Sequence, residues 1–230
     1  SENDRIGRRF HGQQPPRIRA FRIGEMTFLA NPEDSSTIFR MPRLIPKDVL
    51  LTAYARGVFP MAESGEILWF SPEKRGLIPL DERFRVPHGL YKAMKKKPFE
   101  VRRNTAFREV MLGCAERDET WIDEVILNSY CALHEAGHAY SFECWDDEGL
   151  QGGLYGVALG GAFFGESMFS RKTDASKIAL VALVEYLRRK NFQLLDTQWM
   201  TDHLRQFGGY ELPRDQYHAE LAKVLGITSI

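Results

Sequence analysis

The sequence is poor in cysteine and has no excess of charge of either sign. Its 230 residues include 3 cysteines, Cys114, Cys131 and Cys144, and 31 basic residues balance 31 acidic ones. Three widely spaced thiols complete neither a disulfide set nor a metal-binding pattern, which favours a reducing, cytoplasmic setting. A net charge of zero means that any nucleic-acid contact needs a local basic patch. Because no apolar run approaches roughly 18–20 residues, we expect no membrane partner.

Apolar residues are plentiful, at 43% of the chain with 15 phenylalanines, so a large core can form. Apolar spacing predicts helices at 48–57, 87–97, 104–115, 122–136 and 176–190, with Asn104 and Ser176 as N-caps. Strands are predicted at 67–70, 99–102, 139–145, 150–159, 162–169 and 193–196, with a tight turn at Gly160–Gly161. Segments at 203–207 and 215–224 finish the chain. Helices packed on a mostly antiparallel sheet make an α+β fold.

The first 27 residues contain six arginines and three acidic residues. A flexible arm is the ordinary interpretation of such a segment. A tail that contacts tRNA or a membrane surface is the alternative.

Polar side chains interrupt two apolar strands. Glu166 lies with two serines and Arg171 inside the run 163–171, and Asp196 and Gln198 close the run 194–198. Buried polar groups cost free energy unless they are paired, so this concentration predicts a functional site.

The run from His134 to His138 matches the H-E-x-x-H pattern of zinc proteases. That site needs both histidines on one helix face. Gly137 and a β-rich run after His138 indicate a helix end instead, so we expect no metal. In the glycine-rich run 152–156 the order of the residues does not match the motif of a phosphate-binding loop. Its glycines allow either another stretch of backbone or a ligand to approach closely.

A lysine cluster and a loop tryptophan suit nucleic-acid contacts. The cluster comprises Lys92, Lys95, Lys96 and Lys97. A solvated helix face is the ordinary explanation, but four lysines in six positions of a neutral chain also suit a phosphate backbone. Trp121 precedes a helix start and offers a stacking surface for a base.

Several motifs, in the order in which they occur along the chain, resemble those of the leucyl/phenylalanyl-tRNA–protein transferase family. The strongest are Gly165–Arg171 with Ala175–Lys177, then Leu195–Gln198, then Asp202–His203. Supporting runs are Arg56–Pro60, Ile67–Pro72, Thr120–Ile122 and His134–Ala139. The similarity covers roughly residues 28–222.

The resemblance implies a small N-terminal domain at 28–75 and a GCN5-related N-acetyltransferase-like catalytic domain at 76–230, after the arm at 1–27. It implies transfer of Leu, Phe or sometimes Met from aminoacyl-tRNA to proteins that begin with Arg or Lys, which marks them for degradation. It implies no cofactor, and we expect a monomer.

The resemblance also assigns residues. Glu166, Asp196 and Gln198 form the polar catalytic centre, and Trp121 stacks on the terminal adenosine. The donor side-chain pocket is lined by Leu154, Phe163, Leu183 and Leu195, near Phe169. The lysine cluster corresponds to the family's tRNA-binding patch. Met61 stands where the family has a second adenosine-holding Trp, and the family's Gly-Gly-Asp is absent from 41–46.

Aminolysis of an activated ester requires the enzyme to align the donor with the acceptor and to stabilise the oxyanion that forms. Asp196 and Glu166 suit a cationic acceptor residue, and Gln198, a poor base, suits orienting the attacking amine. Asp196 could instead hold Gln198 or relay a proton, with assistance from the ribose hydroxyl. Two rival functions stay open. A CoA-dependent N-acetyltransferase would need a Gln/Arg-x-x-Gly-x-Gly/Ala run before the helix at 176, and none is present. A non-enzymatic tRNA-binding protein would not need the three polar residues together.

Overall fold

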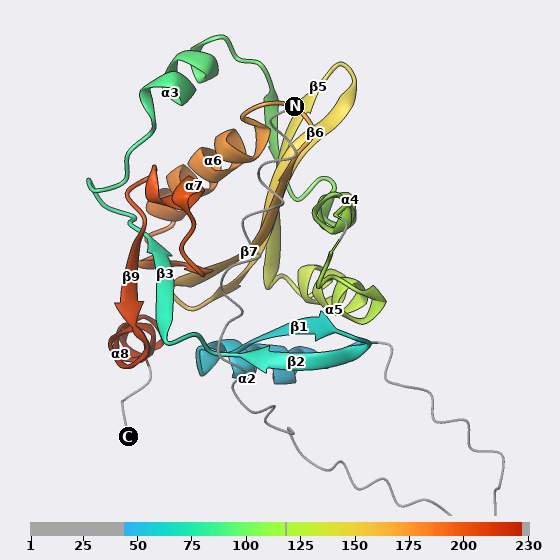
Figure 1. The fold of residues 1–230 in the computed structure, drawn as a ribbon, viewed down its shortest axis with the longest axis vertical. Coiled ribbons are helices and arrows are strands. Elements are labelled where there is room, and N and C mark those ends of the chain that lie inside the picture. The colour runs from blue at the N-terminus through green and yellow to red at the C-terminus, as the bar shows by residue number, and fades with distance from the viewer. Residues whose placement is uncertain (1–43, 118, 227–230) are drawn as a thin grey trace, which may run out of the picture.

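A computed structural model describes residues 44–117 and 119–226 (Figure 1). The expected arm at 1–27 and the first part of the expected N-terminal domain lie outside these residues. The helices are α2 (Lys47–Ala55), α3 (His88–Lys95), α4 (Phe107–Ala115), α5 (Glu124–Glu135), α6 (Ala175–Arg189), α7 (Asp202–Arg205) and α8 (Arg214–Leu225). The strands are β1 (Phe59–Glu63), β2 (Glu66–Phe70), β3 (Lys74–Ile78), β4 (Glu100–Arg103), β5 (Ala139–Asp146), β6 (Gly149–Leu159), β7 (Ala162–Ser170), β8 (Leu194–Gln198) and β9 (Tyr210–Pro213).

A seven-stranded sheet in the order β4-β5-β6-β7-β8-β3-β9 organises the described part of the chain. Strands β7 and β8 run parallel, and the other neighbours in this sheet pair antiparallel. Strands β1 and β2 form a separate antiparallel ribbon. The expected α+β class with a mostly antiparallel sheet is therefore confirmed.

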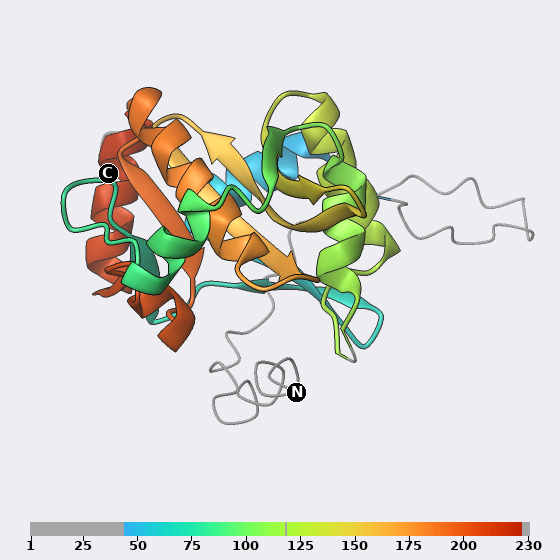
Figure 2. The same ribbon diagram turned by 90° about the horizontal axis from the view of Figure 1, so that it is seen from above.

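The two faces of the sheet carry different helices. Helices α4 and α5 cover one face, while α3 and α6 lie on the other (Figure 2). The first face continues into the core that α2, α8 and the β1–β2 ribbon share. Helix α6 packs against β5, β6 and β7, and its buried stripe includes Ile178, Val181 and Val184. The apolar periodicity of that helix is thus explained by burial on the sheet.

A β-bulge interrupts β7 at Glu166. Gly156 on β6 pairs with Gly165 and Tyr155 pairs with Ser167, so Glu166 is the extra residue. Such a bulge redirects side chains and increases the local twist. Gly156 permits it, because a Cβ there would lie 2.2 Å from the Phe164 carbonyl oxygen.

Three short strands were not predicted from the sequence. These are β1, β3 and β9. Strand β3 reads Lys-Arg-Gly-Leu-Ile between two prolines, which is typical of a loop. Its pairing with β8 on one side and β9 on the other overrides the local propensity.

Both predicted N-caps were wrong. The Asn104 side chain instead accepts a hydrogen bond from the Ser141 amide at 3.0 Å, and α4 begins at Phe107. Asp174, at φ +68°, holds the N-cap position of α6, while the Ser176 amide donates to Ser170 Oγ at 2.9 Å. In both places a hydrogen bond between different elements replaced the local cap.

Candidate active site

The parallel strands β7 and β8 separate just after Phe164 and Asp196, and two of the predicted catalytic residues meet at this opening. The pairing between the strands covers Ala162–Phe164 and Leu194–Asp196. Beyond it, Gln198 Nε2 donates a hydrogen bond to Glu166 Oε1 at 3.0 Å. The bulge at Glu166 makes this contact possible, since it turns that side chain out of the regular alternation of β7.

The backbone at Gln198 has a strained conformation. Its φ is +56°, and the Trp199 amide bonds to the Thr197 carbonyl oxygen at 2.7 Å, which makes a γ-turn centred on Gln198. A γ-turn with positive φ is rare and costly for a side-chain-bearing residue. Gly76 on β3 admits this turn, because a Cβ there would lie 2.8 Å from both Met200 N and Trp199 C. Backbone strain at a chemically important side chain points to a functional constraint.

Asp196 lies beneath this turn in a closed network. Its carboxylate accepts hydrogen bonds from Arg75 Nε at 2.8 Å, Arg75 Nη2 at 2.7 Å, Tyr217 Oη at 2.5 Å and the Gln198 amide at 2.8 Å. The exposed fractions of the Asp196 and Arg75 side chains are 0% and 1%. The expectation that Asp196 faces a cationic acceptor is therefore wrong: its charge is neutralised by an internal arginine, and its oxygens are already occupied.

Arg75 ties distant parts of the chain together. Its guanidinium lies 4.8 Å from the Phe59 ring centroid and 4.7 Å from that of Tyr217, and Nη1 donates to the Gly57 carbonyl oxygen at 3.1 Å. Burial alone would lower the pKa of Arg75, but the adjacent Asp196 raises it above the usual range. Arg75 therefore stays charged and anchors Asp196.

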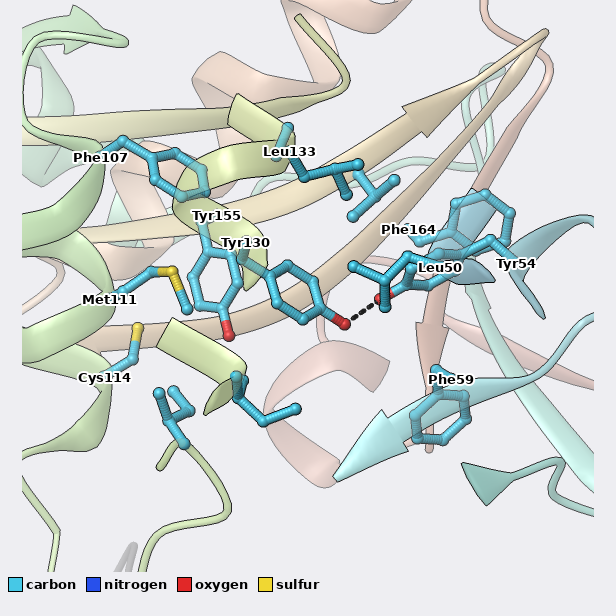
Figure 3. Close-up of a cluster of buried hydrophobic side chains, with 14 of the residues drawn as sticks. Leu50, Tyr54, Phe59, Phe107, Met111, Cys114, Tyr130, Leu133, Tyr155 and Phe164 are labelled. Carbon is cyan, nitrogen blue, oxygen red and sulfur yellow. Dashed lines mark hydrogen bonds between the residues drawn. The ribbon is translucent and has the colours of Figure 1, made fainter. Parts of the chain in front are cut away.

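Glu166 has a different environment. Its side chain is half-buried, and removal from water raises the pKa of Glu166 to about 8, with a further increase from nearby Asp196. Tyr130 Oη lies 3.4 Å from Glu166 Oε2. Figure 3 shows the Tyr54 and Tyr130 hydroxyls pointing toward one another, joined by a hydrogen bond. Burial and the Glu166 charge raise the pKa of both tyrosines, so they remain neutral donors beside this carboxyl group.

The two residues expected to hold adenosine are neighbours. The Ala62 amide donates to the Trp121 carbonyl oxygen at 3.1 Å, which joins β1, next to Met61, to the loop before α5. Both Met61 and Trp121 are half-buried at the margin of the core around Tyr54 and Tyr130. They offer a thioether and an indole surface on the same side of the sheet as Glu166.

The side chains expected to line the donor pocket pack against one another and leave no open pocket between them. Leu154, Phe163, Leu183 and Leu195 are at most 3% exposed and pack together in the cluster under α6. Phe169 belongs to the cluster on the opposite face, where its ring lies against Gly113. The structure thus separates Phe169 from the other four, which occupy the core beside the β7–β8 opening.

The lysine cluster and the histidine motif can also be placed. The four lysines are exposed at and just beyond the end of α3, and none of them forms an ion pair with another described residue.

Helix α5 ends at Glu135, so the two histidines do not share a helix face. His134 instead stacks on Phe107 at 4.3 Å and binds the Ala139 carbonyl oxygen through Nδ1 at 2.7 Å. The predicted helix end is confirmed.

Comparison with known proteins identifies the family. The model described as leucyl/phenylalanyl-tRNA protein transferase matches residues 77–222, and the model of that family's N-terminal domain matches residues 46–73. The chain belongs to the leucyl/phenylalanyl-tRNA–protein transferase family. It is accordingly an aminoacyltransferase. The matched ranges lie on either side of residue 75, where a domain boundary is predicted.

Named members of this family are similar along most of the chain. The leucyl/phenylalanyl-tRNA–protein transferase of Akkermansia muciniphila is 61% identical over 188 residues, 80% of this chain and 97% of the relative. That of Herpetosiphon aurantiacus is 52% identical over 185 residues, 80% of this chain and 97% of the relative. The solved structure of FemX has a TM-score of 0.50 at 13% identity, over 72% of this chain and 66% of FemX. That likeness concerns the fold, which is of the GCN5-related N-acetyltransferase type.

Four residues of the candidate site were not predicted from the sequence. They are Tyr54, Arg75, Tyr130 and Tyr217. The two tyrosines on α2 and α5 look like ordinary core positions, and Arg75 falls in a strand that reads as a loop. A buried carboxylate such as Asp196 does require a cation, but the sequence does not say which arginine, 121 residues away, supplies it.

None of the helices in the described part of the chain is long and apolar enough to cross a membrane.

Proposed function

We propose that this enzyme transfers Leu or Phe, and sometimes Met, from aminoacyl-tRNA to the α-amine of proteins that begin with Arg or Lys. The observation that carries the proposal is the contact between Glu166 and Gln198 at the β7–β8 opening, on the same side of the sheet as Met61 and Trp121. It brings a group that can recognise a cation, a group that can orient an amine and a surface for adenosine to one side of the sheet.

The proposed role of Glu166 is to recognise the first residue of the acceptor. With a pKa of about 8 this carboxyl group is mostly neutral near pH 7 before the acceptor arrives. A guanidinium or ammonium group nearby favours the ionised form, and the resulting hydrogen bonds are charge-assisted. An acceptor that begins with a neutral residue would leave Glu166 without that compensation. Binding and ionisation are therefore coupled to the charge of the acceptor.

The proposed role of Gln198 is to orient the attacking amine. Its amide oxygen can accept a hydrogen bond from the α-amine while Nε2 remains on Glu166. The amine nitrogen attacks the ester carbonyl carbon, a tetrahedral intermediate forms, and the bond from carbon to the ribose oxygen breaks. The nitrogen loses one proton and the ribose oxygen gains one, so protons balance without a cofactor. Asp196 acts through Gln198, because it holds the γ-turn rather than contacting the substrates.

The donor is held through its terminal adenosine and its side chain. Trp121 provides a stacking surface for the base, and Met61 a softer second contact. The side chain of Leu or Phe enters beside Leu154, Phe163, Leu183 and Leu195, which must move apart to admit it because they are packed in the core. A β-branched donor fits such a site worse, by roughly 1–3 kcal/mol per misplaced methyl group.

A transfer assay tests the proposal. Phe-tRNA and Leu-tRNA are supplied with peptides that differ only in a first residue of Arg, Lys or Ala, and peptide-bond formation is measured. We expect transfer to Arg and Lys peptides only. Trp121→Ala is expected to raise the KM for the donor, and Gln198→Ala to lower kcat. Absence of transfer at saturating donor would overturn the proposal, and unchanged kinetics in both variants would overturn the assigned roles.

Two alternatives predict other outcomes. A CoA-dependent acetyltransferase needs open backbone amides where α6 begins, yet the Ser176 amide is capped by Ser170 Oγ, and a Cβ on Gly152 would lie 2.6 Å from the Ala175 Cβ. Calorimetry with acetyl-CoA would detect such an activity. A non-enzymatic tRNA-binding protein would bind tRNA and give no transfer.

A further inference from the structure

A groove of about 390 Å³ lies between the end of α3, strand β4 and helix α6. Its floor is apolar and includes Met94, Phe142, Ile178 and Val181. Because Phe142, Ile178 and Val181 belong to the cluster under α6, the groove lies on the opposite face of the sheet from Tyr54 and Tyr130. Helices α3 and α6 are neighbours in both views, and α3 stands at the far end of the molecule from the β1–β2 ribbon (Figures 1 and 2).

Cations border this groove. Arg102, Arg103 and Arg189 line it, together with one acidic residue, Glu185. The segment from residue 92 to residue 103 contains six basic residues and one acidic residue, in a chain whose net charge is zero. Arg102 also lines an adjoining cavity with Lys97, but that cavity contains Glu100, Asp146 and Asp147 as well, and Arg102 is paired with Glu100. The cations of the groove that form no ion pair with another described residue are therefore Arg103 and Arg189. A patch of this kind on a neutral protein fits a polyanion.

An aromatic ring stands at the side of the groove. Tyr186 is half-buried, and its ring centroid lies 5.6 Å from that of Phe142. The guanidinium of Arg103 lies 4.5 Å from the Tyr186 ring centroid. Proteins bind unstacked bases on aromatic rings and guanidinium planes and hold the flanking phosphates with cations. The groove therefore combines an apolar floor, an aromatic side chain on which a base can stack once Arg103 moves from the ring to a phosphate, and cations that can bind phosphates.

We propose that this groove binds an unstacked nucleotide of the donor tRNA, remote from its aminoacylated end. The base enters beside Tyr186, and Arg103 and Arg189 bind the adjacent phosphates. This proposal rests on the proposed function, since it takes tRNA as the donor. It gives the enzyme a second contact with the RNA on the face of the sheet opposite to Glu166 and Gln198.

Direct binding of deacylated phenylalanine tRNA, measured by fluorescence anisotropy over a range of salt concentrations, tests the groove. Tyr186→Ala is expected to weaken binding by about 5- to 100-fold through loss of stacking, whereas Tyr186→Phe stays within about twofold of the wild type. The double variant Arg103→Ala/Arg189→Ala is expected to reduce the slope of log Kd against log salt by about 1.5, because two phosphate contacts are lost. The matched control is Lys223→Ala on α8, which removes an exposed cation paired with Glu220 and should change neither quantity.

Transfer kinetics separate this proposal from the proposed function. Groove variants should lose kcat/KM with Phe-tRNA and keep the wild-type value with phenylalanyl-adenosine, which is too short to reach the groove. If the wild-type enzyme transfers nothing from Phe-tRNA, the proposed function fails. If transfer is normal but the double arginine variant binds tRNA with the wild-type affinity and salt slope, the groove proposal alone is overturned. Should Tyr186→Ala fail to fold, the double arginine variant still decides.

Discussion

Replacing Asp196 with Asn should damage the fold as well as the chemistry. The substitution keeps the shape of the side chain but leaves the Arg75 guanidinium, 1% exposed, without a counter-charge. Breaking a buried ion pair from one side costs about 3–5 kcal/mol. For a chain of this size 1 kcal/mol corresponds to about 2–4 °C in Tm, so we expect Tm to fall by about 6–20 °C.

Denaturant unfolding and steady-state kinetics together test this expectation. The urea midpoint gives the loss of stability, and kcat is measured at a temperature where each variant is folded. The control Tyr217→Phe removes one hydrogen bond to the same carboxylate and should cost less, about 1.5–3 kcal/mol. The pair Arg75→Met with Asp196→Leu removes both charges and should be more stable than Asp196→Asn. Its kcat should still be low, because the Gln198 amide has lost the acceptor that holds its turn.

Two results would refute this reasoning. An Asp196→Asn variant as stable as the wild type would mean that the carboxylate does not brace Arg75. An Asp196→Asn variant that is as stable as the wild type and keeps the γ-turn at Gln198, yet is inactive, would mean that the charge of Asp196 acts in the reaction itself.

Three further predictions concern Glu166, Gly76 and Met61. The pKa of Glu166 is raised on folding from 4.5 to about 8, so the stability due to this group is complete below about pH 4.5 and is lost as pH rises through 8. Glu166→Gln should flatten the pH dependence of the free energy of unfolding between those values, by on the order of 5 kcal/mol. An unchanged slope would contradict it. Gly76→Ala should displace the turn at Gln198 and lower kcat at least tenfold, since the added methyl group would lie 2.8 Å from backbone atoms; crystallography of the variant would show the shift. Met61→Trp should lower the donor KM severalfold by adding a stacking surface, and a higher KM would argue against adenosine at this margin.

Local patterns were sufficient to predict the α+β fold class and a functional site that includes Glu166 and Gln198. That these two residues share one polar centre was implied by the resemblance to the family. Long apolar strands and the α6 stripe reveal the sheet and its cover, and polar residues within such strands are costly enough to mark a site. The structure brings Glu166 and Gln198 to 3.0 Å as the strands separate.

The support of that site was not predictable from the sequence for a physical reason. Arg75 and Tyr217 join Asp196 across separations of 121 and 21 residues, through a strand whose own residues favour a loop. The partner of Asp196 is decided by packing, which no local pattern records. The same holds for Phe169, which the family resemblance placed near the donor pocket and whose ring lies in the core on the other face of the sheet.

The Arg75 network has a consequence for when the enzyme can work. Arg75 comes early in the described chain, while Asp196 and Tyr217 come late, on β8 and on α8. Closing so long a loop is slow relative to local structure, and a chain emerging from the ribosome cannot close it before α8 has been synthesised. A nascent enzyme in which α2, the β1–β2 ribbon and the face that carries Trp121 have already folded is therefore still inactive. Proteolytic cleavage within α8 would return a folded enzyme to this inactive state, although Glu166 and Gln198 themselves would be intact.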